Sequence, residues 1–207
     1  ELFIKRSPIS EACRGILTTL QILGLDTSER NLNQFRKYFD GQNIEDYIET
    51  VFTKANVSYA VMTNDPFDKN ERHCWQTIGN DNPRFHAALR VDPLLMGWET
   101  LTSLLREQDY ELSHSPNDSN MAEIRRFLDD WANKMNPRYL AVSLTPSFTY
   151  PDDTLVTQII DSCIIPVCRE RNIPFALMIG VKRFINPALK LAGDGVGKAD
   201  LSSIVNL

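Results

Sequence analysis

The chain has 207 residues, of which 43% are hydrophobic and 24% are charged, and its formal net charge is −5. This length and composition allow one large core or two small ones, which excludes a disordered, collagenous or coiled-coil protein. No apolar run reaches the roughly 18 residues that a membrane helix requires. An acidic chain without a basic cluster also argues against nucleic acid as the main partner. We therefore expect a globular protein whose partners include neither membrane nor nucleic acid.

The four cysteines, at positions 13, 74, 163 and 168, form no CxxC pair and no zinc-ribbon spacing. Such scattered cysteines are typical of reduced thiols in a cytoplasmic protein, although a secreted four-cysteine framework stays open. The first residues show no signal-peptide layout. Both ends look cut, so we expect a piece of a longer protein. No pattern fixes the oligomeric state, and a homo-oligomer stays open.

The first 55 residues predict three short helices, because apolar residues recur there at helical spacing. Pro8 suits the first turn of a helix capped by Ser7. Ser28 is expected to cap the second helix, and Asn43 the third. Three short helices in succession predict a small helical layer.

After residue 55 the pattern changes to short, continuous apolar runs separated by helical segments. The runs that predict strands are 57–62, 84–91, 139–144 and 174–179. The helical segments that lie between them are 94–106, 121–135 and 155–171. This alternation predicts a parallel sheet, and runs of this kind fit strands that are buried on both faces.

The alternation is compatible with a doubly wound sheet and with a (β/α)8 barrel. No phosphate-binding glycine motif follows any predicted strand. The glycine-rich stretch 193–197 is expected to be a turn that leads into a capped helix. In both fold types the loops after the strands build the site, so residues at the strand ends are the first candidates.

Four short motifs, in order along the chain, resemble those of one family. The run VMTNDP at 61–66 is similar to a T-T-D-D-P stretch of the uronate isomerases (glucuronate isomerases), in the amidohydrolase superfamily. RVD at 90–92 and MIGVKR at 178–183 are similar to that family's R-P-D and H-I-G-A-x-R motifs. SPIS at 7–10 resembles its N-P-L helix start. The chain thus looks like a central fragment of a uronate isomerase.

The resemblance implies an α/β fold, a partial (β/α)8 TIM barrel of the amidohydrolase type. Residues 1–55 would form a helical insertion, and residues 56–207 would supply central β/α units, incomplete at both ends. The family's H-x-H metal motif and its metal-binding aspartate would lie on strands outside this chain.

The implied activity is the interconversion of an aldohexuronate and a ketohexuronate, such as glucuronate and fructuronate, in sugar-acid catabolism. Two alternatives stay open. The chain could come from a degenerate barrel that binds a sugar acid without converting it. It could also come from a metal-dependent hydrolase or decarboxylase of the same superfamily.

The resemblance also implies a divalent, zinc-like metal in the full-length protein. At the position of the family's metal-binding histidine this chain has Met178, whose thioether is a soft and weak ligand. The strand at 139–144 is followed by no aspartate. We therefore expect residues 1–207 to supply no metal ligand.

The candidate substrate-binding residues are Arg90, Arg183 and Asp65. A guanidinium fork suits a planar sugar carboxylate, and the resemblance places both arginines at strand ends. The structural alternatives are that Arg90 pairs with Asp92 or Asp65, that Arg183 is a surface residue beside Lys182, and that Asp65 only shapes a turn. No catalytic acid or base can be assigned.

The histidines are poor candidates for catalysis or metal binding. His73, His86 and His114 show no ligand spacing, and His86 lies within a predicted strand. A nucleophile pair of His73 with Cys74 is excluded, because neighbours in sequence do not face each other on a helix.

Overall fold

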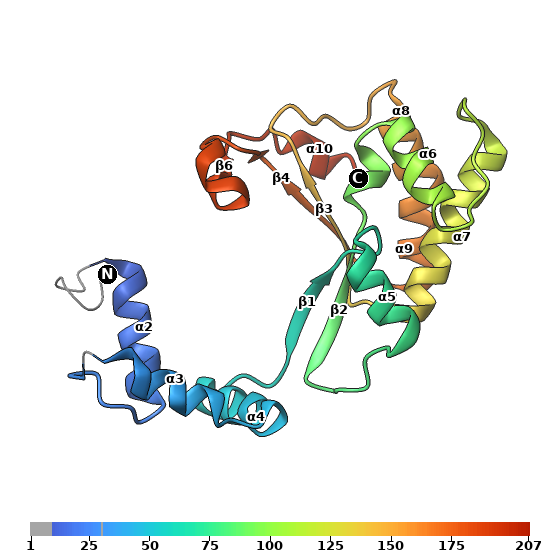
Figure 1. Ribbon diagram of the computed structural model, residues 1–207. Helices are drawn as coiled ribbons and strands as arrows, with labels where there is room; N and C mark the ends of the chain where they lie inside the picture. The colour runs from blue at the N-terminus through green and yellow to red at the C-terminus, as the bar shows by residue number, and fades with distance from the viewer. Residues whose placement is uncertain (1–9, 30) are drawn as a thin grey trace. The chain divides into compact units, whose positions relative to one another are not determined.

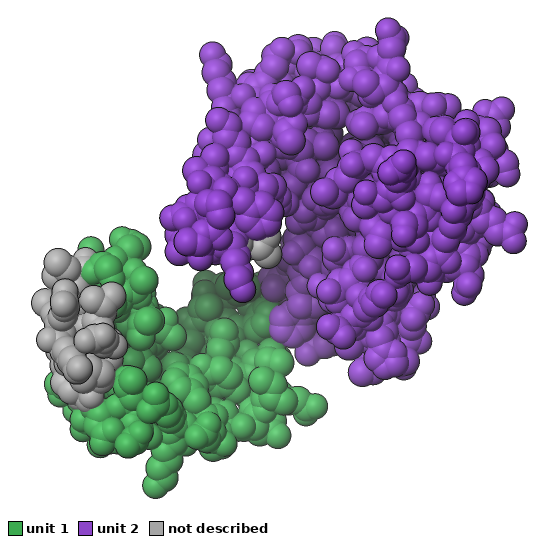
Figure 2. All heavy atoms as spheres, turned by 45° about the horizontal axis from the view of Figure 1, so that its top comes forward, with its two compact units in different colours: residues 1–58 green, residues 59–207 purple. Residues whose placement is uncertain are grey.

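The structure of the protein is a computed structural model that describes residues 10–29 and 31–207. The chain divides into two compact units, residues 1–58 and residues 59–207 (Figure 2). The sequence predicts a change of structure after residue 55, and the division in the structure follows residue 58.

The described residues of the first unit form three helices: α2 (Glu11–Ile22), α3 (Leu32–Asp40) and α4 (Ile44–Ala55). The three predicted helices are thereby confirmed. Nζ of Lys54, in α4, donates a hydrogen bond of 2.9 Å to the carbonyl oxygen of Ile22 at the end of α2. This bond satisfies a carbonyl that the helix itself leaves without a partner.

Helix α2 begins later than the sequence predicts. Its cap is Ser10, whose Oγ accepts a hydrogen bond from the backbone N–H of Cys13 (3.3 Å). The predicted cap Ser7 and the first-turn Pro8 lie outside the described residues, so that part stays a prediction.

The predicted cap of α3 is wrong. The backbone N–H and the hydroxyl of Ser28 both bond to the carboxylate of Asp26 (2.9 and 2.7 Å), which builds a turn and not a helix start. Asn31 caps α3 instead, accepting from the N–H of Asn33 at 3.0 Å. Asn43 caps α4 as predicted.

The second unit is built on four parallel strands in the order β1-β2-β3-β4 (Figure 1). Their bounds are β1 (Ala60–Asn64), β2 (Phe85–Arg90), β3 (Leu140–Leu144) and β4 (Phe175–Ile179). All three neighbouring pairs are parallel, as the sequence predicts. The first strand starts later than the predicted run at 57–62, because α4 ends at a left-handed Asn56 (φ 54°) and the chain must first turn away from it.

Helices α5 (Lys69–Thr77), α6 (Trp98–Arg106) and α7 (Asp118–Met135) lie on one side of the strands, together with a helix at 155–171 (Figure 1). Alternate strand residues bury their side chains against them. The largest side chains in this core with an exposure of 0% are Phe127, Leu89, Leu101, Leu105, Ile124, Leu128, Leu140, Ile160 and Ile164. Burial of this apolar face holds the second unit together.

Burial on both faces, which the short apolar runs predict, is wrong for the outer strands. In β4 the alternate residues Leu177 and Ile179 pack against the core, but Met178 between them is 40% exposed. In β1, Met62 is 36% exposed. The outer strands lack the cover that further strands and helices give in a complete parallel fold.

The predicted helix at 94–106 is interrupted by a glycine. A 3₁₀ helix η1 (Asp92–Leu95) precedes Gly97, whose φ of 124° suits glycine and ends that turn. Helix α6 begins directly after it. The interruption keeps Asp92 near the end of β2 and not within a long helix.

The helix at 155–171 contains a widened turn. It runs as α8 (Leu155–Ile159), a π-helical segment η2 (Ile160–Ile164) and α9 (Ile165–Arg171). The N–H of Ile165 bonds to the carbonyl of Ile160, five residues back. Pro166 explains this geometry, because it has no N–H and its ring would clash with the carbonyl four residues earlier.

After β4 the chain forms a short hairpin, which is not the structure that the sequence predicts. Strand β5 (Val181–Lys182) pairs antiparallel with β6 (Gly195–Val196), and η3 (Pro187–Gly193) lies between them. The stretch 193–197 is therefore part of a strand pair; α10 (Ser202–Val205) follows only later. A Cβ on Gly197 would come within 2.5 Å of Pro146, so the hairpin needs a glycine where it meets the loop after β3.

All four cysteines are free; Cys74 is exposed, and the other three are buried. Burial raises the pKa of the Cys163 thiol to about 12 and that of Cys168 to about 11, so both stay protonated at neutral pH. No helix in the described part of the chain has the length and apolar character to cross a membrane.

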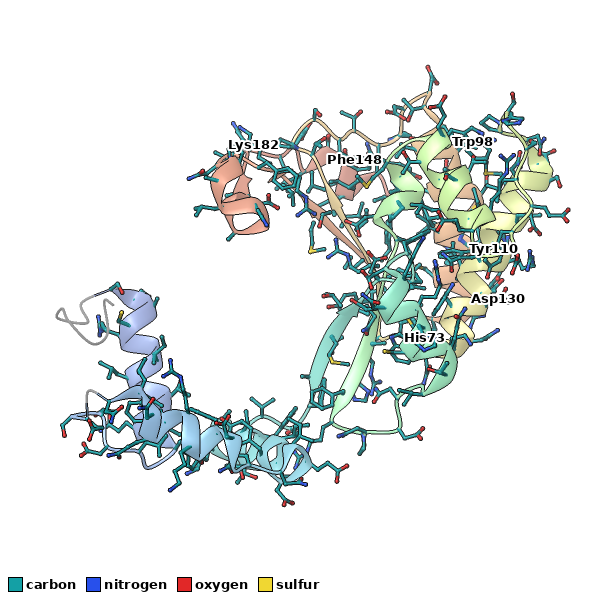
Figure 3. All side chains as sticks on the ribbon, in the orientation of Figure 1. His73, Trp98, Tyr110, Asp130, Phe148 and Lys182 are labelled. Carbon is teal, nitrogen blue, oxygen red and sulfur yellow. The ribbon has the colours of Figure 1, made fainter. Side chains whose placement is uncertain are left out.

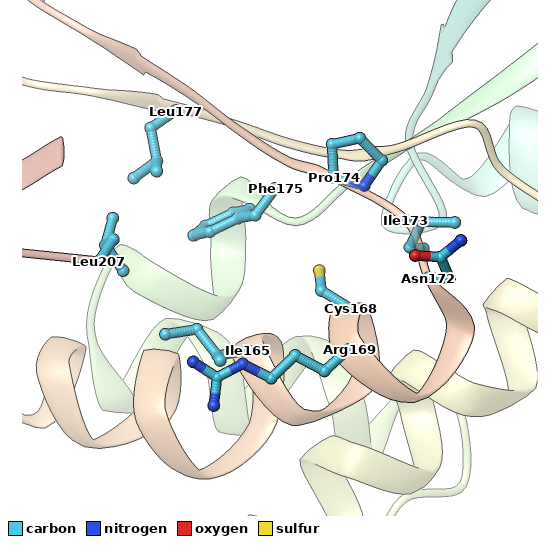
Figure 4. A pocket seen from close by; sticks show the side chains of 9 residues that line it. All are labelled: Ile165, Cys168, Arg169, Asn172, Ile173, Pro174, Phe175, Leu177 and Leu207. Atoms are coloured by element: carbon cyan, nitrogen blue, oxygen red, sulfur yellow. The ribbon is translucent and has the colours of Figure 1, made fainter. Parts of the chain in front are cut away.

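An apolar groove of about 440 Å³ lies between β4 and α9 (Figure 4). Its lining includes Cys168, Phe175, Leu177 and Leu207, and the polar side chains in it are Arg169 and Asn172. Leu177 and Phe175 belong to the helix-facing side of β4. The groove is thus an uncovered part of the core face, near the start of β4 and away from the carboxyl ends of the strands.

Truncation of Phe127 tests the packing of the second unit. The ring is fully buried, with Phe67 at 4.9 Å and Tyr110 at 5.4 Å between centroids. Phe127→Ala should lower the free energy of unfolding by about 3 to 5 kcal/mol, measured by urea denaturation. Ile78→Ala, at a side chain that is 78% exposed, is the control and should change it by less than about 0.5 kcal/mol. Equal effects would contradict the assignment of the core.

Candidate functional site

The carboxyl ends of the four strands meet at one edge of the sheet, where parallel α/β folds place their sites. Leu89 and Leu140 pair across β2 and β3, and both are fully buried against the helices. Successive side chains of a strand point to opposite faces. Arg90 and Ser143 therefore lie on the face opposite the helices.

Arg90 and Asp92 form a two-point ion pair at this edge. Nε of Arg90 donates to Oδ2 of Asp92 (2.7 Å), and Nη2 donates to Oδ1 (2.5 Å). The two side chains are only 22% and 17% exposed. The hydrogen bond to Asp92 raises the pKa of Arg90 above its usual value, so the guanidinium stays charged.

The ion pair is anchored to the neighbouring strand through Ser143. Nη2 of Arg90 donates to Oγ of Ser143 (3.0 Å), and the backbone N–H of Ser143 donates to Oδ1 of Asp92 (3.0 Å). The structural alternative considered for Arg90, pairing with Asp92, is therefore realised. It does not exclude a binding role, because no hydrogen bond of the described residues uses Nη1 of Arg90.

Asp65 directly follows β1 and shapes the turn there. Its Oδ1 accepts a hydrogen bond from the backbone N–H of Phe67 (2.9 Å). Burial raises the pKa of the Asp65 carboxyl, and the nearby charges of Glu71 and Asp92 add to this, whereas the Phe67 bond and Arg90 act in the opposite direction. Asp65 thus belongs to the same charged cluster as Arg90, and its role toward a substrate stays a prediction.

Arg183 lies in the hairpin after β4, one residue beyond β5. Its Nη1 contacts Oδ2 of Asp194 (2.6 Å), and the other carboxylate oxygen accepts from the N–H of Phe184 (2.9 Å). These bonds lower the pKa of Asp194, the bond from Phe184 contributing most. The side chain of Arg183 is 48% exposed. It can therefore turn toward a ligand at little cost in packing.

A cavity of about 420 Å³ brings three of these residues together. Asp92, Ser143 and Arg183 line it, and apolar side chains such as Phe148 and Val181 complete its wall. Arg90 adjoins the cavity through its two partners, Asp92 and Ser143, whereas Asp65 does not line it. In Figure 3, the labelled Phe148 and Lys182 mark this end of the unit.

The histidines lie elsewhere. His73 is in α5, on the helix side with Tyr110 and Asp130 (Figure 3). Nε2 of His86, near the start of β2, is 3.1 Å from Nη2 of Arg138. His114 contributes its carbonyl oxygen to the indole N–H of Trp98 (2.9 Å). None of the three lines the cavity.

The residues present do not fit a zinc-like centre. No group of three or more His, Cys, Asp or Glu side chains that could hold a metal ion lies among the described residues. Met178, opposite Ser143 in the strand pairing, has a thioether that binds hard divalent ions poorly. The expectation that residues 1–207 supply no metal ligand stays a prediction.

Sequence reasoning considered Asp92 as a partner of Arg90 but missed two other partners in the site, Ser143 and Asp194. The pairing with Asp92 carries a usable signal, because residues two apart in an extended segment share a face. Ser143 and Asp194 carry none, since they lie 53 and 11 positions from the arginines they contact. Only the folded sheet and hairpin bring them together.

Comparison with solved structures gives a match over nearly the whole chain. A uronate isomerase from Bacillus halodurans C-125 superposes with a TM-score of 0.92 and is 50% identical. The match covers 99% of this chain and 48% of that one, so the chain spans about half the length of the matched protein. The predicted resemblance to the uronate isomerases is confirmed.

A second solved structure shows the fold alone. It is a glucuronate isomerase from Caulobacter crescentus, with a TM-score of 0.51, 11% identity and coverage of 75% of this chain and 39% of that one. No protein-family model and no curated protein matched the chain. The four parallel strands and these likenesses confirm a partial (β/α)8 barrel.

Replacement of Asp65 by Asn tests the charged cluster. A carboxyl whose pKa is raised in the folded state stabilises the fold below its unfolded pKa and loses that contribution as pH rises through the folded value. Asn cannot ionise, and it keeps the acceptor for the N–H of Phe67. Asp65→Asn should therefore melt at a higher temperature than the wild type at pH 7, with a smaller difference at pH 4. Calorimetry at both values measures this. Asp153→Asn, at an exposed position, is the control, and a variant less stable at pH 7 would refute the argument.

Proposed function

We propose that this chain supplies part of a uronate isomerase, which interconverts an aldohexuronate such as glucuronate and a ketohexuronate such as fructuronate. The observation that carries the proposal is the 50% identity with a uronate isomerase over 99% of this chain. The cavity at the strand ends, with arginines in and beside it, fits an anionic sugar. The proposed substrate is therefore a free hexuronate.

The reaction moves two protons and does not change the composition of the sugar. In the first step a base removes the proton from carbon 2 of the aldose and the oxygen of carbon 1 gains a proton, which gives an enediol. In the second step an acid delivers a proton to carbon 1 and the hydroxyl of carbon 2 loses its proton, which gives the ketose. A positioned acid or base accelerates such steps by roughly 10² to 10⁴-fold. In this proposal the acid and the base lie on strands outside the chain.

The contribution of this chain is the binding of the carboxylate. Arg90 stays charged and retains Nη1 for a ligand, and Arg183 brings a second cation to the cavity. Two arginines at one rim can orient the sugar so that carbons 1 and 2 face the catalytic groups. Asp65, close to Arg90, is proposed as a polar residue of the same rim.

The alternative function is a barrel that binds a uronate without converting it. Met178 favours this reading, because the resemblance places a metal-binding histidine at its position. The four free cysteines support the further proposal that the protein works in a reducing compartment such as the cytoplasm.

A chimaera tests the proposed activity. This chain replaces the matched 48% of the Bacillus halodurans enzyme, and conversion of D-glucuronate is measured. The chimaera should turn over within about 100-fold of the parent, the loss that a misplacement of about 1 Å can cause. The control is the same enzyme without the replaced half, which should be inactive. A folded chimaera that binds glucuronate but does not convert it would support the binding protein instead.

Arg90→Ala tests whether Arg90 of this chain binds the carboxylate of the sugar. Loss of a charged partner from a desolvated carboxylate costs about 2 to 5 kcal/mol. The dissociation constant for D-glucuronate, measured by calorimetric titration, should therefore rise at least about tenfold. Binding of D-glucose, which has no carboxylate, should not change.

The matched control for this variant is Arg171→Ala. Arg171 also pairs with an aspartate, Asp129, but does so on the helix side of the unit. It should leave glucuronate binding unchanged. If Arg90→Ala binds glucuronate as tightly as the wild type, Arg90 has no role in recognition.

A further inference from the structure

Asp92 holds the guanidinium of Arg90 along one edge. The guanidinium is a planar fork with five N–H donors, two on each Nη and one on Nε. Asp92 occupies the edge formed by Nε and Nη2, at 2.7 and 2.5 Å. This pairing fixes the plane of the fork and leaves the opposite edge, formed by Nη1 and Nη2, pointing away from Asp92.

Ser143 stands at that opposite edge. One hydrogen of Nη2 is used by Asp92, so the bond of 3.0 Å from Nη2 to Oγ of Ser143 uses the hydrogen on the Nη1 side. The serine oxygen therefore acts as an acceptor, and its own hydrogen is left to donate. No acceptor for that hydrogen occurs among the hydrogen bonds of the described residues, and Ser143 lines the cavity.

We propose that Nη1 of Arg90 and the hydroxyl of Ser143 form a two-donor subsite for the sugar carboxylate, with Asp92 as the positioning residue. This inference rests on the proposed function, in that the ligand is a uronate. Two donors side by side match the two oxygens of a carboxylate. In this proposal Asp92 does not bind the carboxylate; it holds the guanidinium along its Nε–Nη2 edge and also accepts the hydrogen bond from the backbone N–H of Ser143.

The assignment of Asp92 can be separated from a purely electrostatic effect. Asp92 is a negative charge near an anion site, so its removal would strengthen uronate binding if charge alone mattered. If Asp92 instead positions the guanidinium, its removal should weaken uronate binding. In Asp92→Asn the amide loses the two-point ion pair, the fork is free to rotate, and binding weakens although the site has become more positive.

The experiment measures binding of D-glucuronate and D-glucose to the 207-residue chain by calorimetric titration. Asp92→Asn and Ser143→Ala should each weaken glucuronate binding about tenfold or more, the effect of losing a hydrogen bond to a charged group. Glucose binding should stay within about twofold. A merely structural effect would lower both equally. The control is Asp129→Asn, which breaks the comparable pair with Arg171 and should change neither.

A second measurement follows Arg90 itself. The ¹H–¹⁵N signal of its Nε–H should be observable in the wild type and in Ser143→Ala, and it should broaden or vanish in Asp92→Asn. Tighter or unchanged glucuronate binding in Asp92→Asn would overturn the inference, as would an Arg90 signal that this variant leaves unaltered. If the wild type binds the two sugars equally, the proposed function fails. The Arg90 signal then still decides whether Asp92 holds the guanidinium.

Discussion

The parallel pairing of β2 with β3 is the constraint on which the site depends. Leu89 and Leu140 are register partners, and both must face the helices to bury their side chains. Alternation along the strands then leaves no choice for Arg90, which has to lie on the other face. At the same end of the strands, the carboxylate of Asp92 accepts a hydrogen bond from the backbone N–H of Ser143. A shift of one residue in either strand would bury the arginine among leucines and separate the ion pair from its anchor.

The charged side chains at this edge are paired with each other, so the directions of their hydrogen-bond donors matter more than the net charge of the edge. Arg90 is compensated by Asp92, and Arg183 by Asp194, with Asp65 close to the first pair. The rim is therefore not a strongly positive surface that would attract any anion. In the proposed function, selectivity comes from the directions of the remaining donors, and those directions are set by the side chains that hold each guanidinium. The apolar core on the helix side packs under the strands that carry Arg90 and Ser143.

Local patterns in the sequence predict the strands well, because each is a short apolar run followed by polar residues or proline. Arg90 can be found in the same way, since it ends such a run. The contact of Arg90 with Ser143 cannot, because 53 positions separate them and only the register of the sheet joins them. Competition between similar residues limits the prediction of caps: Ser28 has a hydroxyl that could cap, but its N–H and hydroxyl bond to Asp26 in a turn, and the Oδ1 of Asn31 is the acceptor at the start of α3. The hairpin after β4 escapes prediction because two-residue strands leave almost no pattern.

That hairpin leaves the sheet at Gly180 and returns at Gly197, whose N–H bonds to the carbonyl of Gly180 at 2.7 Å. The two ends of the excursion are thus closed against each other by one short backbone contact. The segment between them, which carries Arg183, is therefore closed at its base by a contact in which Arg183 takes no part. Arg90 belongs to the sheet and Arg183 to this excursion, so the positions of the two arginines are fixed by separate parts of the chain.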